Sequence, residues 1–151
     1  MNPIILYNTN SPIVIDAALK TFLANYPRPI KKALLLPPDM TRLHSLGGVL
    51  CAKLYHLLKD TAQVDIMPAL GTHEPMSKAE RGAFFGDIPD DRFFVHNWRS
   101  DVVKLGEVPA EYVREVSEGI VDEPITVEVN KIVVDGDYDI IIDIPDKNYN
   151  L

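Results

Sequence analysis

Cysteine, basic residues and long apolar runs are all scarce in this chain of 151 residues. The single cysteine, Cys51, excludes an internal disulfide and suits a reducing compartment. Lys and Arg number 15 against 22 Asp and Glu, and the net charge of -7 argues against nucleic acid or an anionic membrane as a partner. No apolar run has the length of a membrane span, and no signal-type segment opens the chain, so we expect a cytoplasmic protein.

Glycine-rich phosphate loops and metal-binding spacings are also missing. The sequence has no Walker-type loop, no Gly-x-Gly-x-x-Gly, and no Cys-x-x-Cys or His-x-x-x-His pair. An acidic group at Asp135, Asp137, Asp139 and Asp143 lacks the glycine and glutamate positions of a calcium loop, and we interpret it as a solvated turn and an outer strand face. The length and the hydrophobic content of 46% indicate one globular domain with a sizeable core.

The most informative features of the sequence are two short polar loops, each of which follows an apolar run. Residues 37–42 follow the apolar run Ala33–Leu36, and residues 71–75 follow Val64–Met67. Between the loops, apolar residues recur at spacings of three and four, as on one buried face of a helix. They are Leu46, Val49, Leu50, Leu54, Leu57 and Leu58. The order is therefore strand, loop, helix, strand, loop, helix.

This order predicts that both loops lie at one edge of a sheet. Arg42 and His73 lie 31 positions apart, about the length of one βαβ unit. A right-handed crossover makes the two strands parallel, so both loops emerge at the carboxyl edge, where open α/β sheets bind ligands. We expect an α/β fold: a three-layer Rossmann-like domain with a mostly parallel sheet.

The other elements are predicted from local patterns. Alternation over Ile125–Val129 indicates a half-buried strand, which Ile132–Val134 would continue, and the run Ile140–Ile142 indicates a fully buried one. Further strands are expected at Ile4–Tyr7, Phe93–His96 and Asp101–Leu105, and helices from Pro12, after Ser77, and over Pro109–Val116.

The two loops carry the side chains suited to chemistry. Arg42 offers a planar fork for a carboxylate or phosphate, Asp39 accepts hydrogen bonds, and Thr41 adds a hydroxyl. His73 can change its charge near neutral pH, which suits proton transfer. The alternative is structural: Asp39 caps its turn and pairs with Arg42 at the surface, and His73 is a hydrogen-bonded turn residue. Together the loops predict an anion site.

The remaining histidines are weaker candidates. His56 falls on the polar face of the long helix, and His44 flanks it. His96 follows an apolar run and is a candidate for the same sheet edge. The alternative there is a buried Trp98 with polar neighbours.

The loop motifs resemble a known family. Asp39–Arg42 followed by Ala69–Ser77 is similar to the amino-terminal domain of the lactate racemase family. His96–Arg99 and Val127–Lys131 resemble segments that come later in that family in the same order. The resemblance extends over about residues 30–142, most of the chain.

The resemblance implies a function and roles for individual residues. Family members racemise or epimerise 2-hydroxy acids by hydride removal and return, using a nickel-pincer nucleotide. His73 matches the catalytic acid/base histidine, and Arg42 and Thr41 match substrate-binding positions. Asp39 and Thr72 are expected beside the cofactor, and no metal ligand is assigned to this chain.

The chain departs from the family pattern in three places. Ser45 stands where a proline is common, and Glu74 where a basic residue is common. After Leu151 the family continues with a Pro-His segment, a Gly-Gly-x-Lys segment and a carboxyl-terminal domain, which mainly binds the cofactor. We therefore expect an enzyme half that is inactive alone, with a 2-hydroxy acid, the missing carboxyl-terminal domain and a second copy of the chain as expected partners. The alternative is a stand-alone module that binds an anion, a hydroxy acid or a nucleotide without catalysis.

Overall fold

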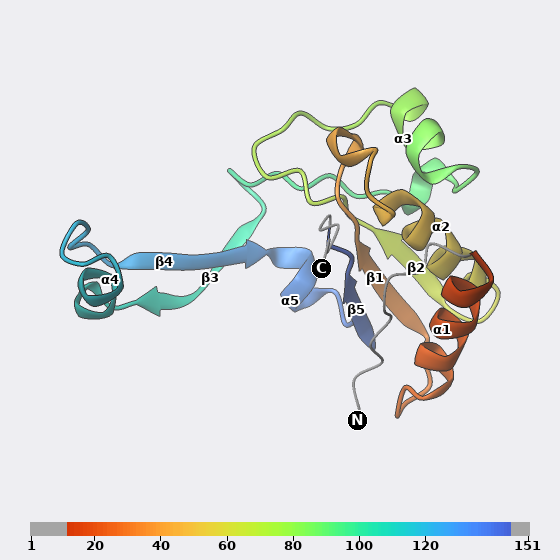
Figure 1. Cartoon of the computed structure of the whole chain (residues 1–151), viewed down its shortest axis with the longest axis horizontal. Helices are drawn as coiled ribbons and strands as arrows, with labels where there is room; N and C mark the ends of the chain where they lie inside the picture. Colours follow the sequence, from red (N-terminus) through yellow and green to blue (C-terminus); the bar gives the residue numbers. More distant parts are fainter. Residues whose placement is uncertain (1–11, 146–151) are drawn as a thin grey trace. The chain divides into compact units, whose positions relative to one another are not determined.

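The computed structural model describes residues 12–145, which form two compact units (Figure 1). Unit 1 comprises residues up to Val95 and from Tyr138 onward, and unit 2 comprises His96–Asp137. Unit 1 contains α1 (Pro12–Ala24), β1 (Lys32–Leu36), the 3-10 turn η1 (Met40–Arg42), α2 (Gly47–Leu58), β2 (Gln63–Ile66), α3 (Lys78–Phe85), the 3-10 turn η2 (Asp90–Arg92) and β5 (Ile140–Asp143). Unit 2 contains β3 (Val102–Val108), α4 (Ala110–Val116), β4 (Ile125–Asn130) and α5 (Lys131–Asp135). No helix among the described residues has the length and apolar character needed to cross a membrane.

A parallel sheet of three strands forms the centre of unit 1. The strand order is β2-β1-β5, and β1 pairs in parallel with both neighbours. Leu34 lies opposite Asp65 on one side and Ile141 on the other. The predicted Rossmann-like α/β fold, with adjacent parallel strands and flanking helices, is confirmed.

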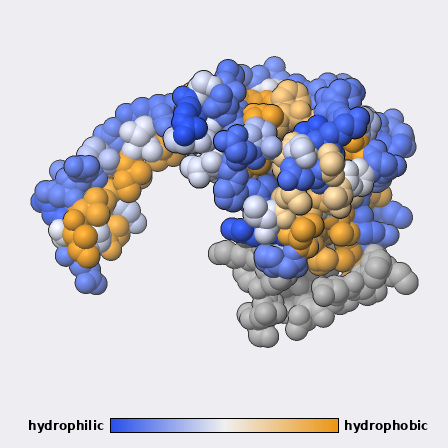
Figure 2. All heavy atoms as spheres, turned by 90° about the horizontal axis from the view of Figure 1, so that it is seen from above, coloured by the Kyte–Doolittle hydropathy of each residue, from blue (hydrophilic) through white to orange (hydrophobic). Residues whose placement is uncertain are grey.

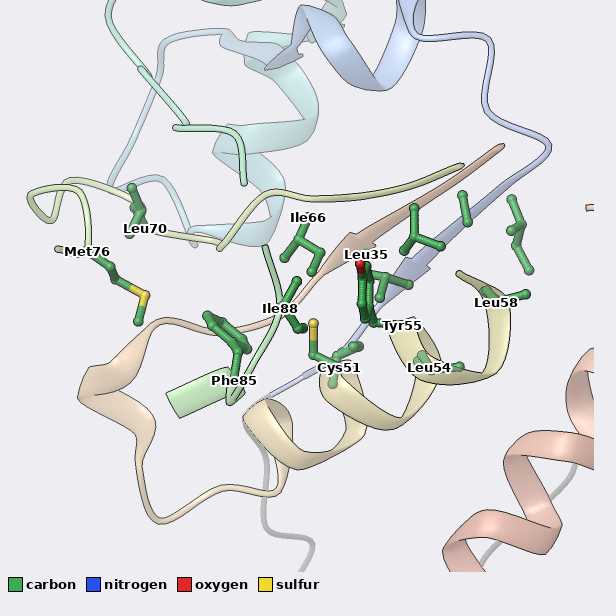
Figure 3. Close-up of a cluster of buried hydrophobic side chains, with 14 residues drawn as sticks. Leu35, Cys51, Leu54, Tyr55, Leu58, Ile66, Leu70, Met76, Phe85 and Ile88 are labelled. Atoms are coloured by element: carbon green, nitrogen blue, oxygen red, sulfur yellow. The ribbon is translucent and has the colours of Figure 1, made fainter. Parts of the chain in front are cut away.

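The core of unit 1 lies between this sheet and its helices (Figure 3). α2 contributes a stripe at spacings of three and four: Cys51, Leu54, Tyr55 and Leu58. Leu19 and Phe22 of α1 pack against the same cluster. The predicted stripe was partly wrong. Leu46 precedes the helix and is 37% exposed, and Val49, in the first turn of the helix, is 47% exposed.

The start of α3 follows the predicted capping box. The Ser77 hydroxyl accepts a hydrogen bond from Glu80 N, and the Glu80 carboxylate accepts one from Ser77 N. Gly86, with φ of 78°, follows the last residue of the helix.

Three strand predictions need correction. Phe93–His96 forms no strand; its backbone pairs with β2 through an isolated bridge of Phe93 to Ile66 and a hydrogen bond from Phe94 N to Ile66 O. Ile132–Val134 lies in helix α5 and does not continue β4, because the Asn130 side chain accepts a hydrogen bond from Ile132 N and caps a helix there. Ile140–Ile142 is not fully buried, since β5 is an outer strand of the described sheet and Ile141 is 39% exposed. The predicted strand Ile4–Tyr7 lies outside the described residues.

Unit 2 is a two-stranded antiparallel ribbon with a short helix between its strands. The register places Val103 opposite Val129 and Val108 opposite Ile125 on one face, while Lys104 and Glu128 share the other. Apolar surface shows along this region in Figure 2. The prediction of a half-buried β4 is wrong in its burial: Ile125 is 53% exposed and Val127 is 39% exposed.

Close packing of α2 against α3 yields a prediction about Gly48. A Cβ atom at Gly48 would lie 2.3 Å from the backbone oxygen of Phe84, whereas one at Gly82 of α3 would meet nothing within 4 Å. We expect Gly48→Ala to lower the free energy of unfolding by about 1–3 kcal/mol through overpacking. Gly82→Ala should instead raise it by up to about 1 kcal/mol, because alanine favours the helix.

Urea unfolding followed by circular dichroism measures both variants. Equal effects of the two substitutions would contradict the packing described here.

Candidate functional site

Backbone pairing between β1 and β2 continues past the ends of both strands. Met67 N donates to Leu35 O at 3.0 Å, and Ala69 N donates to Pro37 O at 2.8 Å. Pro38 and Ala69 then form a parallel bridge. The two polar loops therefore leave the sheet side by side at its carboxyl edge, as predicted from the sequence.

At this edge of the sheet, the side chain of Asp39 is buried. Its side chain is 6% exposed and caps the turn η1, where Oδ1 accepts hydrogen bonds from the backbone N–H of Thr41 at 2.9 Å and from the Thr41 hydroxyl. Its Oδ2 accepts a hydrogen bond from Nδ1 of His73 at 2.6 Å. Burial raises the pKa of Asp39, but the hydrogen bonds from Thr41 and His73 outweigh burial and hold that pKa below its ordinary value.

His73 is presented by a tight turn. Gly71 has φ of 57°, which glycine adopts readily, and His73 N donates to Leu70 O at 2.9 Å to close the turn. The imidazole is 52% exposed, in contrast to its partner Asp39. Because a carboxylate only accepts hydrogen bonds, the neutral ring carries its proton on Nδ1 and leaves the lone pair of Nε2 available as a base.

Arg42 is joined to the same network through Thr41. The Thr41 hydroxyl donates to Asp39 and accepts a hydrogen bond from Nη1 of Arg42 at 3.1 Å. A continuous chain of hydrogen bonds therefore runs from Arg42 to His73. The structural alternative was half right: Asp39 does cap its turn, but the side chain that contacts its Oδ2 is His73.

These side chains line a pocket of about 260 Å³. Its lining residues are Pro38, Asp39, Thr41, Arg42, Ala69, His73, Asp143, Ile144 and Pro145. Four of the five predicted site residues are therefore brought together. Thr72 is the exception: it is exposed and is not part of this lining.

Sequence reasoning missed Asp143, which was interpreted as part of a solvated acidic group. It is the last residue of β5, so it reaches the same edge as the two loops. An available signal was its position directly after the apolar run Ile140–Ile142, like the position of Asp39 after its own run. Asp139 of the same group is structural, since its Oδ2 accepts hydrogen bonds from Lys31 N and Lys32 N.

The other candidates lie outside this pocket lining. His56 is 42% exposed and contacts Asp87, as expected for the polar face of α2. His96 is in unit 2, where its Nδ1 lies 3.0 Å from the side-chain nitrogen of Asn130. The interpretation of Trp98 as buried is wrong, because its side chain is 39% exposed and Arg99 stacks on it.

The described residues do not offer a nickel site. Residues 12–145 contain no group of three or more His, Cys, Asp or Glu side chains arranged to hold a metal ion. The ligand set that nickel chemistry would need is not offered by this part of the chain, so no reaction step through nickel is assigned to it.

Comparisons with solved structures identify the fold. The crystal structure of a protein from Thermotoga maritima matches with a TM-score of 0.74 and 26% identity, over 85% of this chain and 32% of that one. The lactate racemase apoprotein from Thermoanaerobacterium thermosaccharolyticum matches with a TM-score of 0.54 and 20% identity, over 85% of this chain and 31% of that one. This is the fold of part of lactate racemase. The chain spans about a third of each matched protein, while no family model and no curated protein matches it.

The buried carboxylate predicts a pH dependence of stability. The pKa of Asp39 in the folded chain lies below the ordinary value of 3.8, so the stabilising effect of its carboxylate is present above that value and is lost as pH falls through the folded-state pKa. Asp39→Asn resembles the protonated side chain. We expect it to cost on the order of 1–3 kcal/mol of unfolding free energy at pH 7 and less near pH 3.

Urea unfolding at both pH values measures the difference. Asp87→Asn, at a side chain that is 88% exposed, is the control and should have little effect at either pH. A cost of Asp39→Asn that stays constant between the two pH values would contradict the assignment.

Proposed function

We propose that the chain is the substrate-binding and proton-transferring part of a 2-hydroxyacid racemase or epimerase. The observation that carries the proposal is the hydrogen bond of 2.6 Å from His73 to Asp39 in the pocket that Arg42 also lines. This combination supplies a cation for a carboxylate and a base for the neighbouring hydroxyl. The shared fold with part of lactate racemase supports the same reaction class.

Arg42 is assigned to the substrate carboxylate. A guanidinium can give two parallel hydrogen bonds to the two carboxylate oxygens, which fixes the orientation of the acid. Thr41 positions it, because the Thr41 hydroxyl accepts a hydrogen bond from Nη1 of Arg42.

His73 is assigned to the 2-hydroxyl group. Its Nε2 lone pair takes the hydroxyl proton, which leaves an alkoxide on the substrate and an imidazolium on the protein. The Asp39 carboxylate stabilises that imidazolium through the Nδ1 hydrogen bond, and the proton returns to the oxygen when the reaction reverses. Asp39 is therefore a positioning residue, since Thr41 and His73 already occupy its carboxylate.

The rest of the enzyme is assigned to a carboxyl-terminal domain. The matched proteins are about three times as long as the region they share with this chain. In the proposal that domain holds the nickel-pincer nucleotide, because the described residues of this chain offer no metal-binding group. This division of the site makes the chain inactive by itself.

The proposal is tested with a chimera in which this chain replaces the matching region of the Thermoanaerobacterium lactate racemase. Racemisation of a 2-hydroxy acid is measured at steady state with the cofactor loaded. His73→Ala should lower kcat about a hundredfold to ten-thousandfold with a small effect on KM, because it removes the proton acceptor. Arg42→Lys should mainly raise KM, since an ammonium cannot form the two parallel hydrogen bonds.

Arg92→Lys is the matched control, because Arg92 lies in η2 outside the lining of the pocket. Near-normal kcat in His73→Ala would contradict the role of this histidine. A folded, cofactor-loaded chimera without racemase activity would contradict the enzyme-half proposal and favour a binding module.

A further inference from the structure

A second carboxylate, that of Asp143, lies in the pocket that Arg42 and His73 line. We infer that Asp143 selects 2-hydroxy acids that carry a further hydroxyl group on C3 and rejects acids that carry a second carboxylate there. This inference rests on the proposed function, because it takes the ligand to be a 2-hydroxy acid held by Arg42.

Backbone pairing fixes Asp143 at the pocket. It lies opposite Leu36 in the register of β5 with β1, directly before the first polar loop leaves the sheet. The next residue, Ile144, is buried in the core, and its N–H donates to Leu36 O at 3.0 Å. Side chains alternate along a strand, so Asp143 points away from the core face that Ile144 occupies. It is exposed at the carboxyl edge of the sheet.

The carboxylate of Asp143 differs from that of Asp39 in what it can still bind. The Asp39 side chain is 6% exposed, and its oxygens accept hydrogen bonds from Thr41 and His73. For Asp143, the described part of the chain supplies no hydrogen-bond donor and no cation. Its oxygens are therefore available to a donor on the ligand.

The pocket thus presents three different recognition groups. Arg42 suits the carboxylate of the acid, and the Nε2 lone pair of His73 suits the 2-hydroxyl. Asp143, an acceptor when ionised, suits one more donor, and it repels a second carboxylate placed beside it. A substituent on C3 is the part of a small 2-hydroxy acid that the first two groups leave unrecognised.

Three acids that differ only at C3 test this selection. Lactate carries a hydrogen there, glycerate a hydroxyl and malate a carboxylate. Titration of each acid into the 15N-labelled chain, followed by NMR chemical shifts of His73 and the Arg42 side chain, gives the three dissociation constants. We expect glycerate to bind about fivefold more tightly than lactate, and malate to bind about fivefold more weakly than lactate.

Asp143→Asn is the decisive variant, because it keeps the size of the side chain and removes its charge. It should bring the three dissociation constants to within about twofold of one another. Glu74→Gln removes the same charge from the residue after His73, which does not line the pocket, and should preserve the order of the three acids. An unchanged NMR spectrum elsewhere shows that each variant is folded.

The possible outcomes separate this inference from the proposed function. If none of the acids binds, or if Arg42→Lys weakens none of them, the proposed function fails. If all three bind through Arg42 but the wild-type chain does not prefer glycerate, or Asp143→Asn leaves its preference unchanged, only the role of Asp143 is overturned. If Glu74→Gln abolishes the preference as fully as Asp143→Asn does, the selection is a general charge effect and the inference is also overturned.

Discussion

The parallel pairing of β1 with β2 is the constraint on which the candidate site depends. It continues into the loops through the hydrogen bond from Ala69 N to Pro37 O. It thereby brings together the side chains of Asp39 and His73, which lie 34 positions apart in the sequence. Without that pairing, Asp39 would only cap its turn and the His73 imidazole would lack its carboxylate partner. The apolar side chains of α2, β1 and β2 pack together in the core of unit 1 and hold the two strands against each other. The geometry of the pocket at the strand ends therefore depends on this core.

The hydrogen bond between His73 and Asp39 contributes to the stability of the fold and also fixes the orientation of the His73 ring. A buried carboxylate is costly unless donors surround it, and here Thr41 and His73 provide them. The same hydrogen bond fixes which ring nitrogen of His73 carries the proton. The turn after β1 therefore also orients the imidazole that the proposed function uses as a base, and Arg42 lines the same pocket.

The sequence predicted the fold of unit 1 and most of the pocket because periodicity and chain order determine them. Two apolar runs separated by one helical pattern imply parallel strands, and parallel strands place Arg42 and His73 at one edge. Other features depend on packing between distant segments. The exact stripe of α2 follows from how the helix is rotated on the sheet, and the exposure of Ile125 depends on what covers its face. Asp143 was missed because its neighbours in sequence suggested a solvated strand face, and only pairing with β1 places it in the pocket.

The tautomer of His73 tests the central claim most directly, because the proposed base exists only if Asp39 holds the proton on Nδ1. Long-range 1H–15N NMR spectra of the chain above the titration range of histidine distinguish the two neutral forms. We predict the Nδ1–H form for His73 in the wild-type chain, and in Asp39→Ala a shift toward the Nε2–H form that free imidazole side chains favour, with the signals of the other histidines unchanged. An Nε2–H tautomer of His73 in the wild-type chain, or a tautomer unaffected by Asp39→Ala, would contradict the account.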